Sequence, residues 1–156
     1  MVKPKYQKNL VTKPIREKSS EPDMIGRTPS MTYVSNKFFP QLNLYSRWGW
    51  IVGMPDPNPH VARHTHDYDE IVVHIGNDPN DPEDLGGELE FMVDDEPITI
   101  NKTSALYIPK GVPHGPLTWK RVTRPHIEMA IVVGTGDFSK VIPGGYKNPP
   151  KKDSSK

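Results

Sequence analysis

Three histidines and one glutamate stand at spacings that suit a transition-metal site. His64 and His66 are two residues apart, and Glu70 follows the turn-prone residues 67–69. Side chains two residues apart in a β-strand point to the same face, about 6–7 Å apart, so a strand over residues 61–66 directs both imidazoles to one ion. A second strand that opens at Glu70 brings a carboxylate back to that ion.

His114 supplies the third imidazole. It lies within the turn-rich segment 109–115, which follows a predicted strand ending at Ile108. Three neutral imidazoles and one carboxylate suit iron, manganese, nickel, copper, cobalt or zinc, whereas calcium and magnesium prefer oxygen ligands. The chain contains no cysteine, so a thiolate zinc site and a cysteine nucleophile are excluded. The predicted metal ligands are His64, His66, Glu70 and His114.

The elements that position these residues are short β-type runs separated by clusters of Gly, Pro, Asn and Asp. The predicted strands cover residues 45–52, 61–66, 70–75, 88–93, 97–100, 105–108, 117–122 and 126–133. Closely spaced strands of this kind indicate an all-β sandwich or barrel. The 18 prolines agree with few helices, because proline suits turns and sheet edges better than helix interiors.

The two histidine-containing segments resemble the two sequence motifs of the cupin superfamily. The first motif, His-x-His followed by Glu, is matched by His64, His66 and Glu70, and the second, Pro-x-Gly-x-x-His, by Pro109, Gly111 and His114. The resemblance implies a small single-domain cupin, a double-stranded β-helix or jelly-roll β-barrel that holds one ion inside. The chain departs from the pattern in the acidic segment 76–87, predicted as a loop, which lengthens the stretch between the motifs.

Further polar side chains are candidates for catalysis. His74 shares a strand face with Glu70, so we expect it to lie deeper in the barrel or beside the ion. There it either orients a ligand or a substrate, or it is a buried histidine that hydrogen-bonds a backbone carbonyl. His126 and Glu128 share one face of a strand whose other face, around Met129, is wholly apolar. They are acid–base candidates if that apolar face is covered, although a surface position is slightly favoured because antiparallel strands commonly have one wet face.

The domain organisation follows from composition. Residues 1–36 are predicted as an extended N-terminal arm that could dock on the barrel, residues 37–142 as the barrel and 143–156 as a flexible tail. We expect four aromatic residues of the predicted strands to pack in the core: Trp48, Trp50, Tyr107 and Trp119.

The distribution of charged residues along the chain limits the classes of partner that it could bind. Residues 1–37 hold eight basic and three acidic side chains and 147–156 hold four and one, which leaves 8 basic and 15 acidic, a net charge of −7, in residues 38–146. A nucleic-acid surface on the barrel is therefore disfavoured. The N-terminus lacks an apolar signal region and no run approaches the ~18 apolar residues of a membrane span, so a cytoplasmic protein without membrane contact is expected.

The open coordination of such a site indicates an enzyme. Four protein ligands leave one or two positions free on a six-coordinate ion, where a small-molecule substrate or dioxygen binds. Resemblance to small cupins suggests a non-haem iron dioxygenase acting on a small organic acid or aromatic. The alternatives are an oxygen-independent isomerase, decarboxylase or lyase, and a non-catalytic metal- or small-ligand-binding cupin. The same resemblance, the apolar Met129 face and the N-terminal arm suggest a homodimer.

Overall fold

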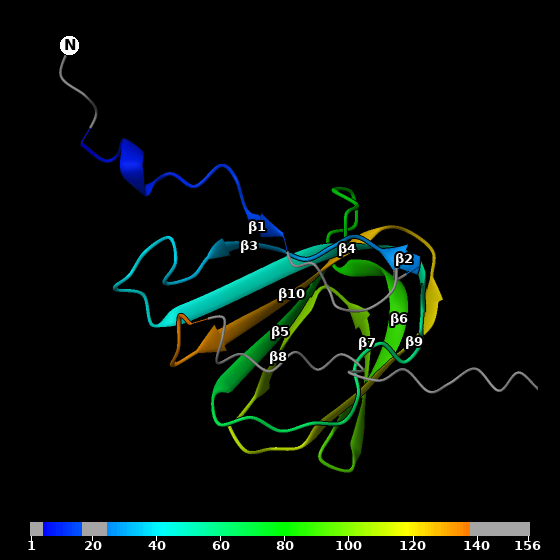
Figure 1. Ribbon diagram of the computed structural model, residues 1–156. Helices are drawn as coiled ribbons and strands as arrows, with labels where there is room; N and C mark the ends of the chain where they lie inside the picture. Colours follow the sequence, from blue (N-terminus) through cyan, green and yellow to red (C-terminus); the bar gives the residue numbers. More distant parts are fainter. Residues whose placement is uncertain (1–4, 17–24, 138–156) are drawn as a thin grey trace, which may run out of the picture.

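The structure, a computed structural model, describes residues 5–16 and 25–137 as two antiparallel β-sheets and one 3-10 turn at Gln7–Asn9 (Figure 1). The larger sheet has the strand order β1-β3-β4-β10-β5-β8, with β2 also paired to β4, and the smaller has the order β7-β6-β9. The strands are β1 (Ile15–Arg16), β2 (Ile25–Arg27), β3 (Met31–Val34), β4 (Leu44–Asp56), β5 (Asp69–Ile75), β6 (Asp84–Val93), β7 (Glu96–Lys102), β8 (Ser104–Ile108), β9 (His114–Val122) and β10 (His126–Val133). The all-β class is as predicted.

The core lies between the two sheets. Ile51, Val72 and Ile108 from the larger sheet pack with Phe91 and Leu117 from the smaller one, and all are nearly or fully buried. Because side chains alternate along a strand, the inward positions of β5 are Glu70, Val72 and His74. The same alternation on β10 turns His126 and Val132 inward, and both are buried.

The segment before β5 departs from the prediction, because residues 61–66 form no regular strand. They still lie antiparallel beside β9 through isolated bridges that pair Val61 with Leu117 and His64 with His114. Upstream, Pro57 and Pro59 have no amide hydrogen to donate to a ladder. The side chain of Asn58 takes over the pairing: its Nδ2 donates to the Trp119 carbonyl at 2.8 Å, and its Oδ1 accepts from the Trp119 amide at 2.9 Å.

Part of the predicted N-terminal arm belongs to the larger sheet, because β2 and β3 both pair with β4. Gly26 has a φ of 80°, and a Cβ at this position would collide with the backbone carbonyl of Met54, so the close crossing of β2 over β4 requires glycine. Residues 1–4, 17–24 and 138–156, including the predicted tail 143–156, lie outside the described residues.

The acidic loop is shorter than expected, since β6 begins at Asp84 instead of residue 88. Asp84 forms an ion pair with Arg124, and Gly86 accepts hydrogen bonds from the amides of Thr123 and Arg124, which ties this end of β6 to the turn before β10. Tyr107, predicted in the core, is 56% exposed because it points outward from the edge strand β8. Within the described ranges, no helix has the length and apolar character needed to cross a membrane.

Candidate metal centre

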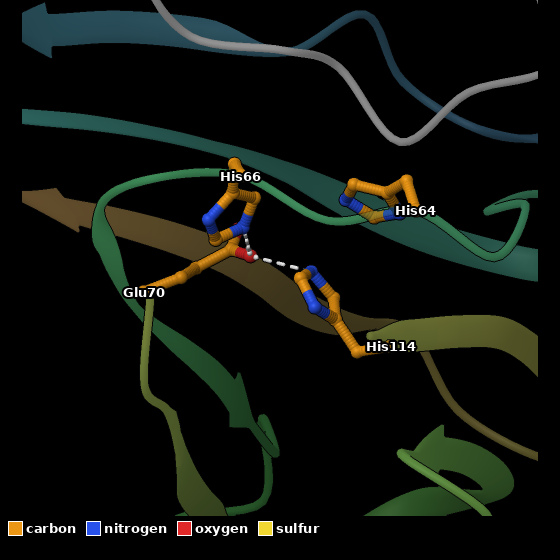
Figure 2. Close-up of side chains that lie close together, drawn as sticks. All are labelled: His64, His66, Glu70 and His114. Carbon is orange, nitrogen blue, oxygen red and sulfur yellow. Dashed lines mark hydrogen bonds and ion pairs between the residues drawn. The ribbon is translucent and has the colours of Figure 1, made fainter. Parts of the chain in front are cut away.

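The side chains of the four predicted ligand residues lie close together (Figure 2). Their ligand atoms all lie within 4.8 Å of one another. Glu70 Oε2 is 3.1 Å from His66 Nε2 and 3.3 Å from His114 Nε2, and the ring centroids of His64 and His114 are 4.2 Å apart. Such a group could hold one metal ion.

Backbone pairing brings the four side chains together. The amides and carbonyls of His64 and His114 exchange two hydrogen bonds of 2.9 Å, so the segment before β5 is fixed to the start of β9. The amide of Gly111 donates to the carbonyl of His66 at 2.8 Å, which holds the second histidine against the loop before β9. Glu70 enters from β5, where it pairs with Ile108 of β8.

The hydrogen bonds of the imidazoles fix where their protons sit. Each Nδ1 of His64, His66 and His114 lies 2.8–2.9 Å from a backbone carbonyl oxygen, which can only accept. Nδ1–H therefore donates, and in the neutral ring Nε2 carries a lone pair. In His66 and His114 this Nε2 atom lies beside Glu70 Oε2. Nε2 of His114 is buried without a hydrogen-bond partner. Imidazoles oriented by a carbonyl on one nitrogen and free on the other are the usual ligands of divalent transition metals.

The electrostatics of the site agree with this donor set. Burial alone would raise the pKa of Glu70, but the neighbouring His114 and His66 rings outweigh it and lower the pKa to about 2. Burial lowers the pKa of His64, which keeps that ring neutral. An ionised carboxylate beside imidazoles whose Nδ1 is bonded to a carbonyl fits a divalent cation such as iron, manganese, nickel, cobalt, copper or zinc.

The metal site is partly exposed, at His64 and Glu70. His66 and His114 are buried and the Glu70 side chain is 14% exposed, whereas His64 is half-buried. The ring of Tyr68 stacks on His66 with a centroid distance of 3.9 Å and an interplanar angle of 9°, so it forms a wall behind that ligand. A small molecule would approach the four ligands from the His64 side.

No protein-family model and no curated protein matches the sequence. Among solved structures, the chain is similar to the polyketide cyclase RemF from Streptomyces resistomycificus, with 11% identity, a TM-score of 0.52, and coverage of 77% of this chain and 73% of that one. It is also similar to a cupin-2 domain protein from Rhodospirillum rubrum, with 13% identity, a TM-score of 0.50, and coverage of 80% and 70%. The chain has the cupin fold. The jelly-roll barrel expected from the two motifs is thereby confirmed.

The three catalytic candidates lie deeper in the cupin barrel than the metal ligands. His74 and Glu128 face each other across β5 and β10, one step beyond the pair of Val72 and Ala130. His74 and His126 are fully buried, and the Glu128 side chain is 16% exposed, so the surface position favoured for His126 and Glu128 is wrong. Antiparallel strands commonly turn their polar face to water, but on β10 the face that carries His126 and Glu128 lies inside.

Two further residues complete this group, which we name the deep cluster: His60, His74, Trp119, His126 and Glu128. The indole Nε1–H of Trp119 donates to His60 Nδ1 at 3.1 Å, so His60 Nε2 carries the proton and donates to Glu128 Oε1 at 3.2 Å. The His126 Nδ1–H donates to the Arg124 carbonyl at 3.1 Å. Neither ring nitrogen of His74 has a hydrogen-bond partner, so of its two predicted roles the bond to a backbone carbonyl is absent.

The deep cluster resembles the metal site in its ionised carboxylate and differs from it in the proton placement of His60. Burial would raise the pKa of Glu128, but His60, Arg27 and His74 outweigh it and keep the carboxylate ionised. Burial lowers the pKa of His74 to about 4 and also lowers that of His126, so both rings are neutral near pH 7. His60 was missed from the sequence because it belongs to no spaced motif; Pro59 before it gave no signal of a buried histidine.

Proposed function

We propose that this cupin binds one divalent transition-metal ion through His64, His66, Glu70 and His114, and acts as a non-haem iron dioxygenase on a small organic acid or aromatic. The observation that carries the proposal is the proton placement at the four ligands. All three Nδ1 atoms are held by backbone carbonyls, and the three Nε2 lone pairs and one ionised carboxylate face a common point.

The protein residues prepare the site for a substrate that binds the ion directly. The backbone hydrogen bonds hold each imidazole in one orientation, and the Tyr68 ring restrains His66. Three histidines and a carboxylate leave coordination positions open on the half-buried His64 side. A bound iron ion would supply redox and Lewis-acid chemistry at these positions.

The position of the deep cluster favours oxygen chemistry over proton transfer. Val72 lies between Glu70 and His74 on the inward face of β5, so His74 and its cross-strand neighbour Glu128 are set back from the ligand Glu70. A dioxygenase uses dioxygen and its metal for the oxidation, whereas an isomerase or lyase depends on a well-placed acid or base.

An oxygen-independent isomerase, decarboxylase or lyase is the second candidate. The observation that favours it is the presence of two neutral buried imidazoles, His74 and His126, beside the ionised Glu128, which are suitable groups for moving protons. RemF, which shares the fold, is a polyketide cyclase. A metal-binding cupin without catalysis is the remaining alternative.

Metal analysis and oxygen uptake separate these candidates. Protein purified without added metal is expected to contain about one iron per chain and to consume oxygen with members of a panel of small organic and aromatic acids. Oxygen-independent turnover with manganese, nickel or zinc would establish the second candidate instead. Metal binding without turnover would leave only the binding role, and wild-type metal content in a His64→Ala, His114→Ala double variant would refute the site.

A further inference from the structure

Most of the buried polar side-chain atoms that lack a hydrogen-bond partner belong to the deep cluster or to the serine beside it. Among the described residues there are seven such atoms, and four of them lie here: Nδ1 and Nε2 of His74, Nε2 of His126 and Oγ of Ser104. Ser104 of β8 pairs with His74, and His74 pairs with Glu128 of β10. Because paired residues of neighbouring strands direct their side chains to the same side of the sheet, these groups face the barrel interior together.

A buried polar atom without a partner is costly, because it has lost its hydrogen bonds to water. Native proteins therefore satisfy nearly all such atoms with a protein group, an ordered water or a ligand. His74 and His126 are fully buried, but the Glu128 side chain beside them is 16% exposed, so a water-sized molecule reaches this group. Four orphaned atoms around one carboxylate indicate a binding site for a small polar group.

The hydrogen-bonding capacity of these atoms selects the kind of group that binds. Nε2 of His126 can only accept, because Nδ1–H of the same ring donates to the Arg124 carbonyl. The neutral ring of His74 offers one donor and one acceptor, and the hydroxyl of Ser104 offers both. A hydroxyl group matches this set because it donates and accepts. An ammonium group cannot accept, and the ionised Glu128 repels a carboxylate.

We propose that the deep cluster and Ser104 bind a hydroxyl group at the far end of the substrate, which is therefore a hydroxylated organic acid. This inference rests on the proposed function, because it names the substrate class of the same barrel. Glu70, Val72 and His74 follow one another on the inward face of β5, and Glu70 and His74 are about 13 Å apart along the strand. The substrate binds the ion with one end, contacts Val72 with an apolar middle and reaches His74 with its hydroxyl group.

The row of inward residues between the two sites suits such a molecule. Val72 pairs with Leu106 of β8 and with Ala130 of β10, so three apolar side chains lie side by side there. Ala130 is the smallest of the three and is half-buried. Arg47 of β4 continues the row beyond Ala130, and its positive charge favours an acid over an amine in this part of the barrel.

Matched pairs of acids test the proposal. The pairs are benzoate and para-hydroxybenzoate, phenylpropanoate and its para-hydroxy counterpart, and hexanoate and its omega-hydroxy counterpart. Calorimetric titration of the zinc-loaded full chain measures their affinities without oxidation, because zinc has no redox chemistry. The hydroxylated member of at least one pair is expected to bind at least about 5-fold more tightly, the effect of one added hydrogen bond.

Three variants show whether the deep cluster causes this preference. His74→Phe keeps an aromatic ring but has no ring nitrogen, and Ser104→Ala removes only a hydroxyl group, so both should lose most of the preference. Tyr107→Phe is the matched control: it removes a polar atom from an exposed ring on the outer side of β8, and it should keep the full preference. Wild-type zinc content in each variant shows that it is folded. In the wild-type chain, the hydroxylated acid should also shift the ring-nitrogen NMR signals of His74, which a histidine with only a packing role would not show.

Equal affinities within every pair, or no binding of any of the acids, would overturn the proposal, and water would then be the occupant of the deep cluster. A preference that survives in both His74→Phe and Ser104→Ala would also overturn it, because the hydroxyl group would then be bound elsewhere. Failure of the proposed function is a separate result. An iron-loaded chain that consumes no oxygen refutes the dioxygenase, but the hydroxyl preference of the zinc-loaded chain is unaffected.

Discussion

Each imidazole around Glu70 has its Nδ1 beside a backbone carbonyl, whereas His60 in the deep cluster has its Nδ1 beside the indole N–H of Trp119. A carbonyl requires the proton on Nδ1 and leaves Nε2 as a lone pair, while an N–H donor requires the reverse. The same side-chain type therefore presents metal-binding lone pairs at one end of the barrel and a hydrogen-bond donor to Glu128 at the other.

Replacing His114 by alanine tests this distinction at the level of one residue. His114→Ala removes one of the four ligands, so the affinity for a divalent metal is expected to fall by more than the roughly 10- to 100-fold typical of residues that only orient ligands. His126→Ala is the matched control, since His126 is equally buried and its Nδ1 also donates to a carbonyl. Metal titration should show near-wild-type affinity for the control; equal losses in both variants would contradict the assignment.

His74 makes stability depend on pH. Its pKa is lowered from 6.5 to about 4 in the folded chain, first by burial, so the unfolded chain binds more protons between these values. This contribution to stability is present above pH 6.5 and is lost as the pH falls toward 4. Going from pH ~7.5 to ~5 should cost about 2 kcal/mol of unfolding free energy from this residue alone.

Urea unfolding with a chelator present measures the effect without a contribution from bound metal. His74→Leu should show a smaller loss of stability between the two pH values than the wild type, because the variant has no imidazole to protonate at this position. The carboxylates Glu70 and Glu128 contribute at lower pH, since their pKa values are lowered from 4.5. An unchanged pH dependence in the variant would contradict the burial argument.

At the scale of elements, the irregular segment 57–66 carries two metal ligands and His60 without being a strand. Asn58 anchors its start through two hydrogen bonds to the backbone of Trp119 on β9. Asn58→Ala removes both, so it should destabilise the chain by about 1–3 kcal/mol and weaken metal binding, because His64 and His66 lose part of their positioning. Thermal unfolding and metal titration check this, with exposed Asn80→Ala as control; equal effects in both variants would contradict it.

The sequence predicted the four ligand residues and their convergence because motif spacing and strand alternation depend on local geometry. It did not predict the irregular path of residues 61–66. The side chain of Asn58 replaces backbone pairing just before this segment, and such a replacement leaves no periodic pattern in the sequence. Nor did alternation place Glu128 inside, since antiparallel strands commonly turn their polar face to water, whereas on β10 the polar face is the covered one. The pairing of β2 with β4 depends on a close crossing at Gly26, which composition does not reveal.

At the scale of the whole molecule, the four ligands come from three separate parts of the fold. Glu70 belongs to the larger sheet, His114 to the smaller sheet, and His64 and His66 to the segment that joins β4 to β5. An ion held by all four would bridge the two sheets at the open end of the barrel. The metal-bound chain should therefore resist unfolding as one unit, because separating the sheets would break the coordination.

Calorimetry with and without metal tests this coupling. A ligand that binds only the folded chain adds about 4 kcal/mol at a thousand times its Kd, which for a chain of this size raises Tm on the order of 10 °C. The increase should disappear on adding a chelator and should be absent in Glu70→Gln, whose side chain lacks the negative charge. Gln substitution at Glu88, a half-buried β6 position paired with Arg121, is the matched control and should retain the full increase. A metal-induced rise in Tm that survives Glu70→Gln would show that the ion stabilises the chain from another site.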